Sequence, residues 1–249
     1  VLWTIESLFG QMIPATKFPR IVSYLPMAHI AARAGDHYQA IYRIGQIFPV
    51  PILEDMKDAL PTIKPSVFLA VPRVWEKFKA GLEAKIEENP KKDLIAKAIQ
   101  NGLEKVDYEQ SGESVPFMVG LKDKIFAKLV FSKFKEGLGI VDTEYFVTAA
   151  APMNKDVHRW FHAIGIDVTE IYGMTEDTGP ATIGVPGNAV QSFEKRLKVD
   201  SIKVPSVLNP IGKVGIPIPG TEVKVMEDGE LCIKGNHVAQ GYFKSEEQT

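Results

Sequence analysis

The feature that most constrains the fold is the alternation of short β-rich runs with segments of helical periodicity. The run "SVFLAVP" (Ser66–Pro72) precedes a segment in which apolar residues recur at every fourth position, which predicts one buried helix face. Further runs predicted as strands lie at residues 20–29, 46–50, 143–152 and 166–176. Strands that alternate with helices pair in parallel. We therefore predict an α/β fold with mostly parallel sheets and helices on both faces.

The character of the chain changes at about Gly184. The following segment is polar and has no clear periodicity, whereas "TEVKVMEDGELCIKG" predicts a β-hairpin with its turn at Asp228-Gly229. We predict two parts: an α/β core over residues 1–183, and a linker with a small antiparallel β subdomain over residues 184–249.

Composition narrows the function classes. The formal net charge of -2 argues against a nucleic-acid partner, which a basic excess would accompany. The single cysteine, Cys232, cannot form an intramolecular disulfide and fits a reducing compartment. We expect a cytoplasmic protein, with peripheral contact at the inner membrane surface as a further option.

The stretch "IYGMTEDTG" (Ile171–Gly179) places an aromatic ring, a glycine, hydroxyls and carboxylates directly after an apolar run. In a right-handed β–α–β unit both strand-to-helix loops emerge at one edge of the sheet. This places "TAAAP" (Thr148–Pro152) beside "YGMTE" (Tyr172–Glu176), at the carboxyl edge where ligands bind in open α/β sheets.

The residue types at this edge suit a magnesium nucleotide. Tyr172 offers a flat face for stacking on a base, and Gly173 permits a close approach to the backbone. Thr175 offers a hydroxyl to a phosphate, and Glu176 offers a hard oxygen to Mg²⁺. A plain turn with a solvated Glu176 is the alternative, and spacing alone leaves both interpretations open.

Six motifs add a resemblance to the adenylate-forming (AMP-binding) superfamily, and to its acyl-CoA synthetases in particular. In chain order they are "SYLPMAHI", "FLAVPRVWEK", "TAAAPM", "EIYGMTE", "GKVGIPIPGTEVKV" and "DGELCIKGNHVAQGYFKSEEQT". The resemblance extends from Val1 to Thr249. The long helical stretch between Trp75 and Thr143 is similar to that of the long-chain fatty acid branch.

The resemblance implies roles for individual residues. Thr175 and Glu176 are the implied catalytic residues, and Glu176 is also the implied Mg²⁺ ligand. The implied acyl-binding residues are His29, Ala150 and Met174. The implied nucleotide-binding residues are Ala149, Ala150, Ala151, Pro152, Ile171, Tyr172, Gly173, Met174 and Thr175.

The resemblance also implies a reaction. A long-chain fatty acid would be activated with ATP to acyl-AMP, and CoA would then displace AMP. A fatty acyl-AMP ligase, or another adenylating enzyme with a different acceptor, is the alternative within the family. A non-catalytic acyl- or nucleotide-binding module is the alternative from another class.

The chain departs from the family pattern in two ways. Ala149 stands where the family usually has glycine, which matters if the backbone φ is positive there. No Ser/Thr/Gly-rich phosphate loop with its lysine occurs in the chain. By family order that loop belongs upstream, and the C-terminal domain with its catalytic lysine belongs downstream. We therefore expect an internal fragment of the large N-terminal domain that is inactive by itself.

Three further features each leave two interpretations. The helix predicted over Phe117–Leu138 carries apolar residues at positions 117, 121, 125, 129 and 134 among lysines. Such a helix could lie on an anionic membrane. We predict instead that its apolar side packs on the sheet. The basic segment Lys195–Lys203 could contact CoA phosphates, but a solvated loop is favoured. His158 and His162 could share a metal, but contacts with neighbouring elements are favoured.

Overall fold

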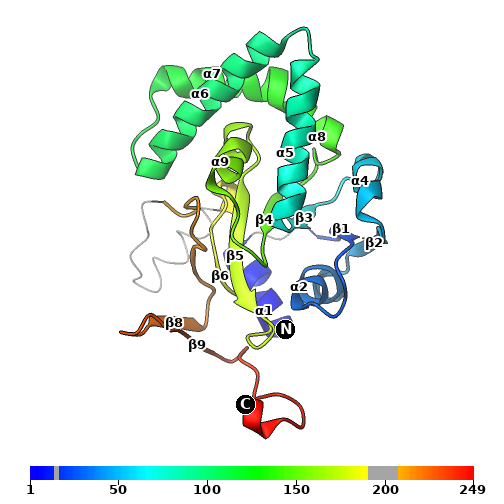
Figure 1. Cartoon of the computed structure of the whole chain (residues 1–249), viewed down its shortest axis with the longest axis vertical. Coiled ribbons are helices and arrows are strands. Elements are labelled where there is room, and N and C mark those ends of the chain that lie inside the picture. Colours follow the sequence, from blue (N-terminus) through cyan, green and yellow to red (C-terminus); the bar gives the residue numbers. More distant parts are fainter. Residues whose placement is uncertain (14–16, 190–206) are drawn as a thin grey trace.

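A seven-stranded, mostly parallel sheet forms the centre of the molecule, and its strand order is β2-β1-β3-β4-β5-β6-β7. The computed structural model describes residues 1–13, 17–189 and 207–249. Helices cover both faces of the sheet, and a separate two-stranded sheet lies below it in the view of Figure 1. The predicted α/β fold with a small antiparallel β unit is confirmed.

Five strands run parallel and two antiparallel strands follow them. Val67 pairs with Tyr145 and Phe68 pairs with Phe146, so alternate residues of β3 and β4 face opposite layers. The strands are β1 (Arg20–Ser23), β2 (Gln46–Pro49), β3 (Val67–Ala70), β4 (Tyr145–Thr148), β5 (Val168–Met174), β6 (Gly179–Ile183) and β7 (Ile216–Pro217).

One face carries the larger hydrophobic core. Trp75 is fully buried, lies edge-on to Phe68 of β3 at 5.5 Å and to Phe161 at 5.0 Å, and packs the helices of this face against the sheet. The elements on this face are η3 (Leu53–Asp55), α4 (Met56–Ile63), α5 (Pro72–Glu87), α6 (Lys92–Ser111), α7 (Phe117–Phe126), η4 (Ala127–Phe131), α8 (Ser132–Leu138) and α9 (Lys155–Ala163).

Local signals in the sequence fix where these helices begin. Pro72 occupies the first turn of α5, where its missing N–H costs nothing. Asn154 caps α9, because its side-chain oxygen accepts hydrogen bonds from the N–H groups of Asp156 and Val157. Asparagine is one of the residue types that favour this position, so the start of α9 follows from a local signal.

Two helical segments cover the other face of the sheet. Their apolar side chains pack with Val67, Tyr145 and Ile183 to form a second, smaller core. The first segment comprises α1 (Leu2–Ile5) and η1 (Glu6–Met12), and the second comprises α2 (Ile30–Ala32), η2 (Arg33–Tyr38) and α3 (Gln39–Arg43).

The C-terminal part contains the predicted hairpin. Strands β8 (Thr221–Val225) and β9 (Leu231–Gly235) pair antiparallel, and Gly229 has φ +90 in the turn. Strand β7 pairs with β6, so the main sheet continues beyond residue 184. Among its described residues this part also contains two short helical turns, η5 (Gly187–Ala189) and η6 (Glu246–Gln248). The segment Lys195–Lys203 lies outside the described residues.

The predicted packing of the helix Phe117–Leu138 is wrong for positions 117, 121, 125 and 129, whereas Phe134 is half-buried and packs against the larger core. Phe117 is 79% exposed and Leu129 is 60% exposed, and Leu121 and Ile125 are exposed as well. The reason is that α7 lies against α6, outside the first helical layer (Figure 1). In α7 the buried residue is therefore Val119, whereas Val130 and Phe131 of η4 are buried in the larger core. Among the described residues, no helix is long and apolar enough to span a membrane.

Candidate functional site

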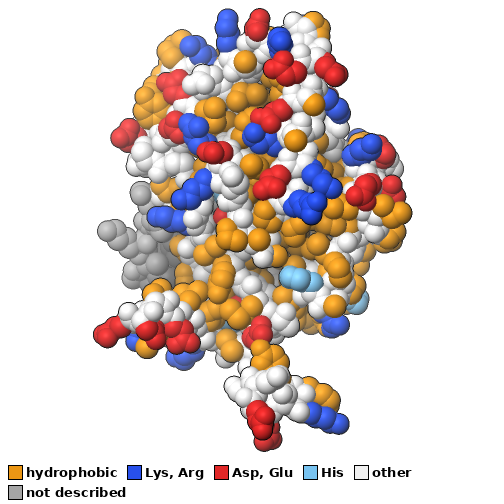
Figure 2. All heavy atoms as spheres, in the orientation of Figure 1, with side chains coloured by type: hydrophobic (Ala, Val, Ile, Leu, Met, Phe, Trp, Pro, Cys, Tyr) orange, Lys and Arg blue, Asp and Glu red, His pale blue; other side chains and the backbone are white. Residues whose placement is uncertain are grey.

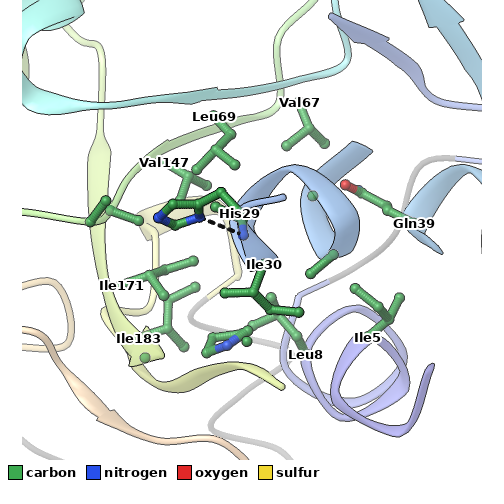
Figure 3. A pocket seen from close by; sticks show the side chains of 18 of the residues that line it. Ile5, Leu8, His29, Ile30, Gln39, Val67, Leu69, Val147, Ile171 and Ile183 are labelled. Carbon is green, nitrogen blue, oxygen red and sulfur yellow. Dashed lines mark hydrogen bonds between the residues drawn. The ribbon is translucent and has the colours of Figure 1, made fainter. Parts of the chain in front are cut away.

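A mostly apolar cavity of about 340 Å³ lies between the sheet and the helical segments of the smaller core (Figure 3). That volume is typical of small-molecule binding sites. Strands β3, β4 and β5 supply one wall, and η1, α2 and η2 supply the other. The apolar lining consists of Ile5, Leu8, Phe9, Ile13, Ile30, Val67, Leu69, Val147, Ile171 and Ile183.

Most of the residues singled out from the sequence lie around this one cavity. Those that line it are His29, Ala149, Ala150, Ile171, Gly173, Met174, Thr175 and Glu176. They belong to the loops after β1 and β4, to the last residues of β5 and to the turn after it, which meet because parallel strands end at the same edge. Ala151, Pro152 and Tyr172 do not line it. Tyr172 pairs through its backbone with Thr182, and residues that alternate along β5 point to opposite faces.

His29 has a defined orientation at the cavity wall. Its ring nitrogen Nδ1 accepts a hydrogen bond of 3.0 Å from the N–H of Ala31, so the side chain caps α2 (Figure 3). Since an accepting Nδ1 carries no proton, the neutral ring has its N–H at Nε2. That N–H remains available to donate to a ligand.

The loop after β4 contains a strained residue. Ala150 has φ +74, in the left-handed region that disfavours a side chain with Cβ. Ala149, where the resemblance implies a departure in backbone geometry, is not among the residues with positive φ. The alanine that would be relieved by glycine is therefore Ala150. Strained backbone of this kind concentrates at ligand sites.

The fold leaves no room for a side chain at Gly173. A Cβ at Gly173 would lie 1.9 Å from the carbonyl oxygen of Gly179. The pairing of β5 with β6 shifts register between Tyr172 and Gly173, which brings the two backbones this close. The turn between these strands thus folds back tightly and presents residues 174–176 toward the cavity.

Asp177 holds this turn and was not identified from the sequence. It is buried, and its Oδ1 accepts hydrogen bonds from the N–H groups of Met174 at 2.9 Å and Gly179 at 3.2 Å. Burial raises the pKa of its carboxyl group. An Asp before Thr-Gly at the end of a strand is a typical turn signal, and it could have indicated this role.

Glu176 points outward at the mouth of the cavity. Its Oε1 accepts a hydrogen bond of 2.5 Å from the hydroxyl of Tyr242, which lowers the pKa of the Glu176 carboxyl group. The backbone carbonyl of Glu176 also accepts a hydrogen bond from the N–H of Ala239. The segment around Tyr242 therefore fixes the loop from the C-terminal side, a long-range contact with no local sequence signal.

The loop residues fit a magnesium ion that is bound mainly through a nucleotide. Mg²⁺ takes one or two carboxylates together with phosphate oxygens and waters. Glu176 supplies an exposed carboxylate, and Thr175 supplies a neighbouring exposed hydroxyl. Within the described part of the chain, no group of three or more His, Cys, Asp or Glu side chains could hold a metal ion by itself.

His158 and His162 share a structural role. The Nε2 atoms of both rings donate to the carbonyl oxygen of Val168, at 2.7 Å and 3.0 Å. Burial lowers the pKa of His158 to about 4, so the ring is neutral at pH 7. These contacts attach α9 to the start of β5 and support the expectation that the pair contacts neighbouring elements.

Gln39 and Asp36 are buried polar side chains of the second helical segment. Gln39 lines the apolar cavity and is 1% exposed, and its Nε2 has no hydrogen-bond partner among the described residues. In Figure 3 this amide lies on the side of the cavity away from Ile171 and Ile183. Burial raises the pKa of Asp36 to about 6.

Fold and site together define an α/β domain with an apolar cavity whose mouth is built from loops at the carboxyl edge of the sheet. Comparison with known proteins makes the assignment specific. The family model described as AMP-binding enzyme matches residues 1–243. The chain belongs to this family of adenylate-forming enzymes.

Curated relatives carry related names. The chain is 31% identical over 239 residues to the long-chain-fatty-acid–CoA ligase ACSBG2 of Xenopus laevis, a match that covers 92% of this chain and 29% of the relative. It is 31% identical over 263 residues to the protein of the same name from Mus musculus, covering 100% of this chain and 36% of the relative. The chain therefore spans about a third of the length of these relatives.

Solved structures support the same fold. A benzoate CoA ligase from Burkholderia xenovorans superposes with a TM-score of 0.58 at 15% identity, over 98% of this chain and 38% of that one. The N-terminal domain of FACL13 from Mycobacterium tuberculosis gives a TM-score of 0.56 at 17% identity, over 98% of this chain and 46% of that one. At these identities the likeness is one of fold.

Proposed function

We propose that the chain provides the nucleotide-side and acyl-binding part of a long-chain fatty acid–CoA ligase. The observation that carries the proposal is the arrangement of the cavity. An apolar space suited to an acyl chain opens directly beneath the Thr175–Glu176 loop, so a carboxyl group at its mouth would meet the nucleotide phosphates there. The names of the relatives support the substrate class.

The proposed reaction has two steps. A carboxylate oxygen of the fatty acid attacks the α-phosphorus of ATP, and the bond to pyrophosphate breaks to leave acyl-AMP. The thiolate of CoA, its proton lost to solvent, then attacks the acyl carbonyl carbon and displaces AMP. A fatty acid held in a cavity whose mouth binds the nucleotide reacts with little loss of translational freedom.

The residues have distinct proposed roles. Thr175 would donate its hydroxyl to a phosphate oxygen, and Glu176 would hold Mg²⁺, which would neutralise phosphate charge when bound. Ala149 to Pro152 and Ile171 to Met174 border the nucleotide, with Tyr172 as the stacking aromatic. His29, Ala150 and Met174 border the reacting end of the acyl chain.

Release of AMP by the full-length product of the gene that encodes this chain tests the proposal. The assay compares long-chain fatty acid with no acid, each with and without CoA. Release that requires both acid and CoA supports the ligase. Acyl-adenylate that accumulates while CoA remains unused would instead identify a fatty acyl-AMP ligase. Absence of turnover with any fatty acid, while acid and nucleotide still bind, would identify a non-catalytic binding module.

A further inference from the structure

The helix from Phe117 to Leu138 carries an exposed apolar stripe that no described part of the chain covers. Phe117 is 79% exposed, Met118 56%, and Leu129 60%, and Leu121 and Ile125 lie between them on the same side. The spacing of three to four residues places these side chains in one row. A contiguous exposed apolar surface of this kind is typical of an interaction site.

Lysines accompany the stripe. Lys122, Lys124 and Lys128 are exposed on the same helix, beside the apolar row. The nearest carboxylate on α7, that of Asp123, is occupied by an ion pair of 3.1 Å with Lys105 of α6. Glu136, one exposed acidic residue, lies beyond the end of the stripe in α8. The apolar row is thus flanked mainly by positive charge.

A groove beside the stripe also combines apolar side chains with lysines. It lies between α5, α6 and η4–α8, and its rim includes the exposed apolar side chains of Leu94 and Leu129. Lys85, Lys91 and Lys133 also line it, and no Asp or Glu is among its lining residues. None of these three lysines takes part in an ion pair within the part of the chain that the structure describes. Figure 2 shows hydrophobic side chains exposed among charged ones over these helices, at the top of the molecule.

We propose that this surface, defined by the apolar stripe of α7–η4 and the lysine-lined groove, binds an anionic lipid bilayer. The apolar row enters the boundary between headgroups and acyl chains, and the lysines meet anionic headgroups. A protein partner would need an acidic surface combined with an apolar ridge of its own. An anionic membrane always combines the two, because its charged headgroups lie next to the hydrocarbon that an amphipathic helix contacts. The surface is distinct from the cavity mouth, so it positions the protein at a lipid surface without covering the site.

Flotation with lipid vesicles tests this proposal, using the full-length gene product. We expect binding to vesicles that contain phosphatidylglycerol and phosphatidylcholine, little binding to pure phosphatidylcholine, and weakening by salt. Each lysine that contacts the surface contributes about a fivefold change in binding, so Lys128→Glu should weaken binding at least fivefold. Leu129→Glu should also weaken it, since the charge opposes insertion of the stripe.

Matched controls separate the surface from general effects of charge. Val225→Glu changes an apolar residue of β8 that is 66% exposed, and Lys224→Glu changes a neighbouring exposed lysine. Both should bind vesicles as the unmodified protein does. Equal binding by Leu129→Glu and Val225→Glu would overturn the proposal. So would a change of oligomeric state in Leu129→Glu with no change in vesicle binding, because the stripe would then be a protein interface.

Discussion

The hydroxyl of Tyr242 donates a hydrogen bond of 2.5 Å to Oε1 of Glu176. The two residues are far apart in the sequence, and the contact joins the loop after β5 to the segment that follows the hairpin. The hydrogen bond stabilises the ionised carboxylate, so it lowers the pKa of Glu176 and raises the pKa of Tyr242. The proposed magnesium ligand is thereby held in its charged form and in one orientation.

Replacing Tyr242 should change the pH dependence of adenylate formation. In Tyr242→Phe the carboxyl group of Glu176 loses the donor that lowers its pKa, and its pKa rises toward the ordinary value. Because the ionised form binds Mg²⁺, the acid limb of the rate profile should move to higher pH. Tyr42→Phe, at an exposed position of α3, is the control. An acid limb that does not move in Tyr242→Phe would show that this contact does not tune Glu176.

Asp36 should make stability depend on pH in a particular direction. Burial raises its pKa from 3.8 to about 6, so the folded state binds the proton more tightly than the unfolded state does. The ionised side chain therefore costs stability as pH rises from about 4 to about 6, and the full cost is present at pH 7. Asp36→Asn should increase the free energy of unfolding at pH 7 by on the order of 2 kcal/mol.

The gain in Asp36→Asn should shrink to a small fraction of its pH 7 value when unfolding is measured near pH 4, where Asp36 is protonated in the folded state and only partly ionised in the unfolded state. Urea denaturation at pH 7 and pH 4 measures both values. Asp58→Asn, an exposed substitution in α4, should leave the free energy of unfolding within about 0.5 kcal/mol at either pH. A gain in Asp36→Asn that is equal at the two pH values would contradict the burial argument.

Gly35 should control which acyl chains fit the cavity. It lines the cavity from η2, and a Cβ there would lie 2.8 Å from Cδ2 of Leu69. Gly35→Leu should fill part of the space and lower kcat/KM for long-chain acids by about tenfold or more relative to medium-chain acids, about 1–3 kcal/mol of discrimination. Gly81→Leu, in α5 where an added Cβ would have no atom within 4 Å, should not change the preference. An equal loss for all chain lengths would argue against an acyl site here.

Ala150 and Ala149 should respond in opposite ways to glycine. Ala150→Gly relieves the left-handed strain of about 1–2 kcal/mol. It also costs about 0.5–1 kcal/mol, because glycine increases the conformational entropy of the unfolded chain. A net increase of up to about 1 kcal/mol in the free energy of unfolding is expected. Ala149→Gly has no such strain to relieve and should lower it by about 0.5–1 kcal/mol. Chemical denaturation of both variants measures the difference, and a loss in Ala150→Gly would refute it.

Much of the fold could be predicted because its signals are local. Apolar spacing located α5 with Val74 and Leu82 on its buried face, and Asn154 marked the start of α9. The parallel pairing followed from alternation, and it brought the loops after β4 and β5 together. These inferences use only residues close together in the sequence and the right-handedness of β–α–β crossovers.

The remaining features depend on contacts that spacing cannot show. The α7 stripe looks core-facing in a helical wheel, but α6 lies between α7 and the sheet and leaves it exposed. The hydrogen bond from Tyr242 to Glu176 joins distant segments. The positive φ at Ala150 rather than Ala149 depends on how one loop turns. Each of these is decided by tertiary packing, which overrides local preference.

The most direct test of the central claim is the exchange of labelled pyrophosphate into ATP, catalysed by the full-length gene product with a long-chain fatty acid and without CoA. Exchange reports reversible acyl-adenylate formation alone. We predict exchange that depends on the fatty acid, falls at least 100-fold in Glu176→Gln, and is unchanged in Glu227→Gln, an exposed control in the hairpin. Full exchange in Glu176→Gln would contradict the assignment of this loop as the magnesium–nucleotide site.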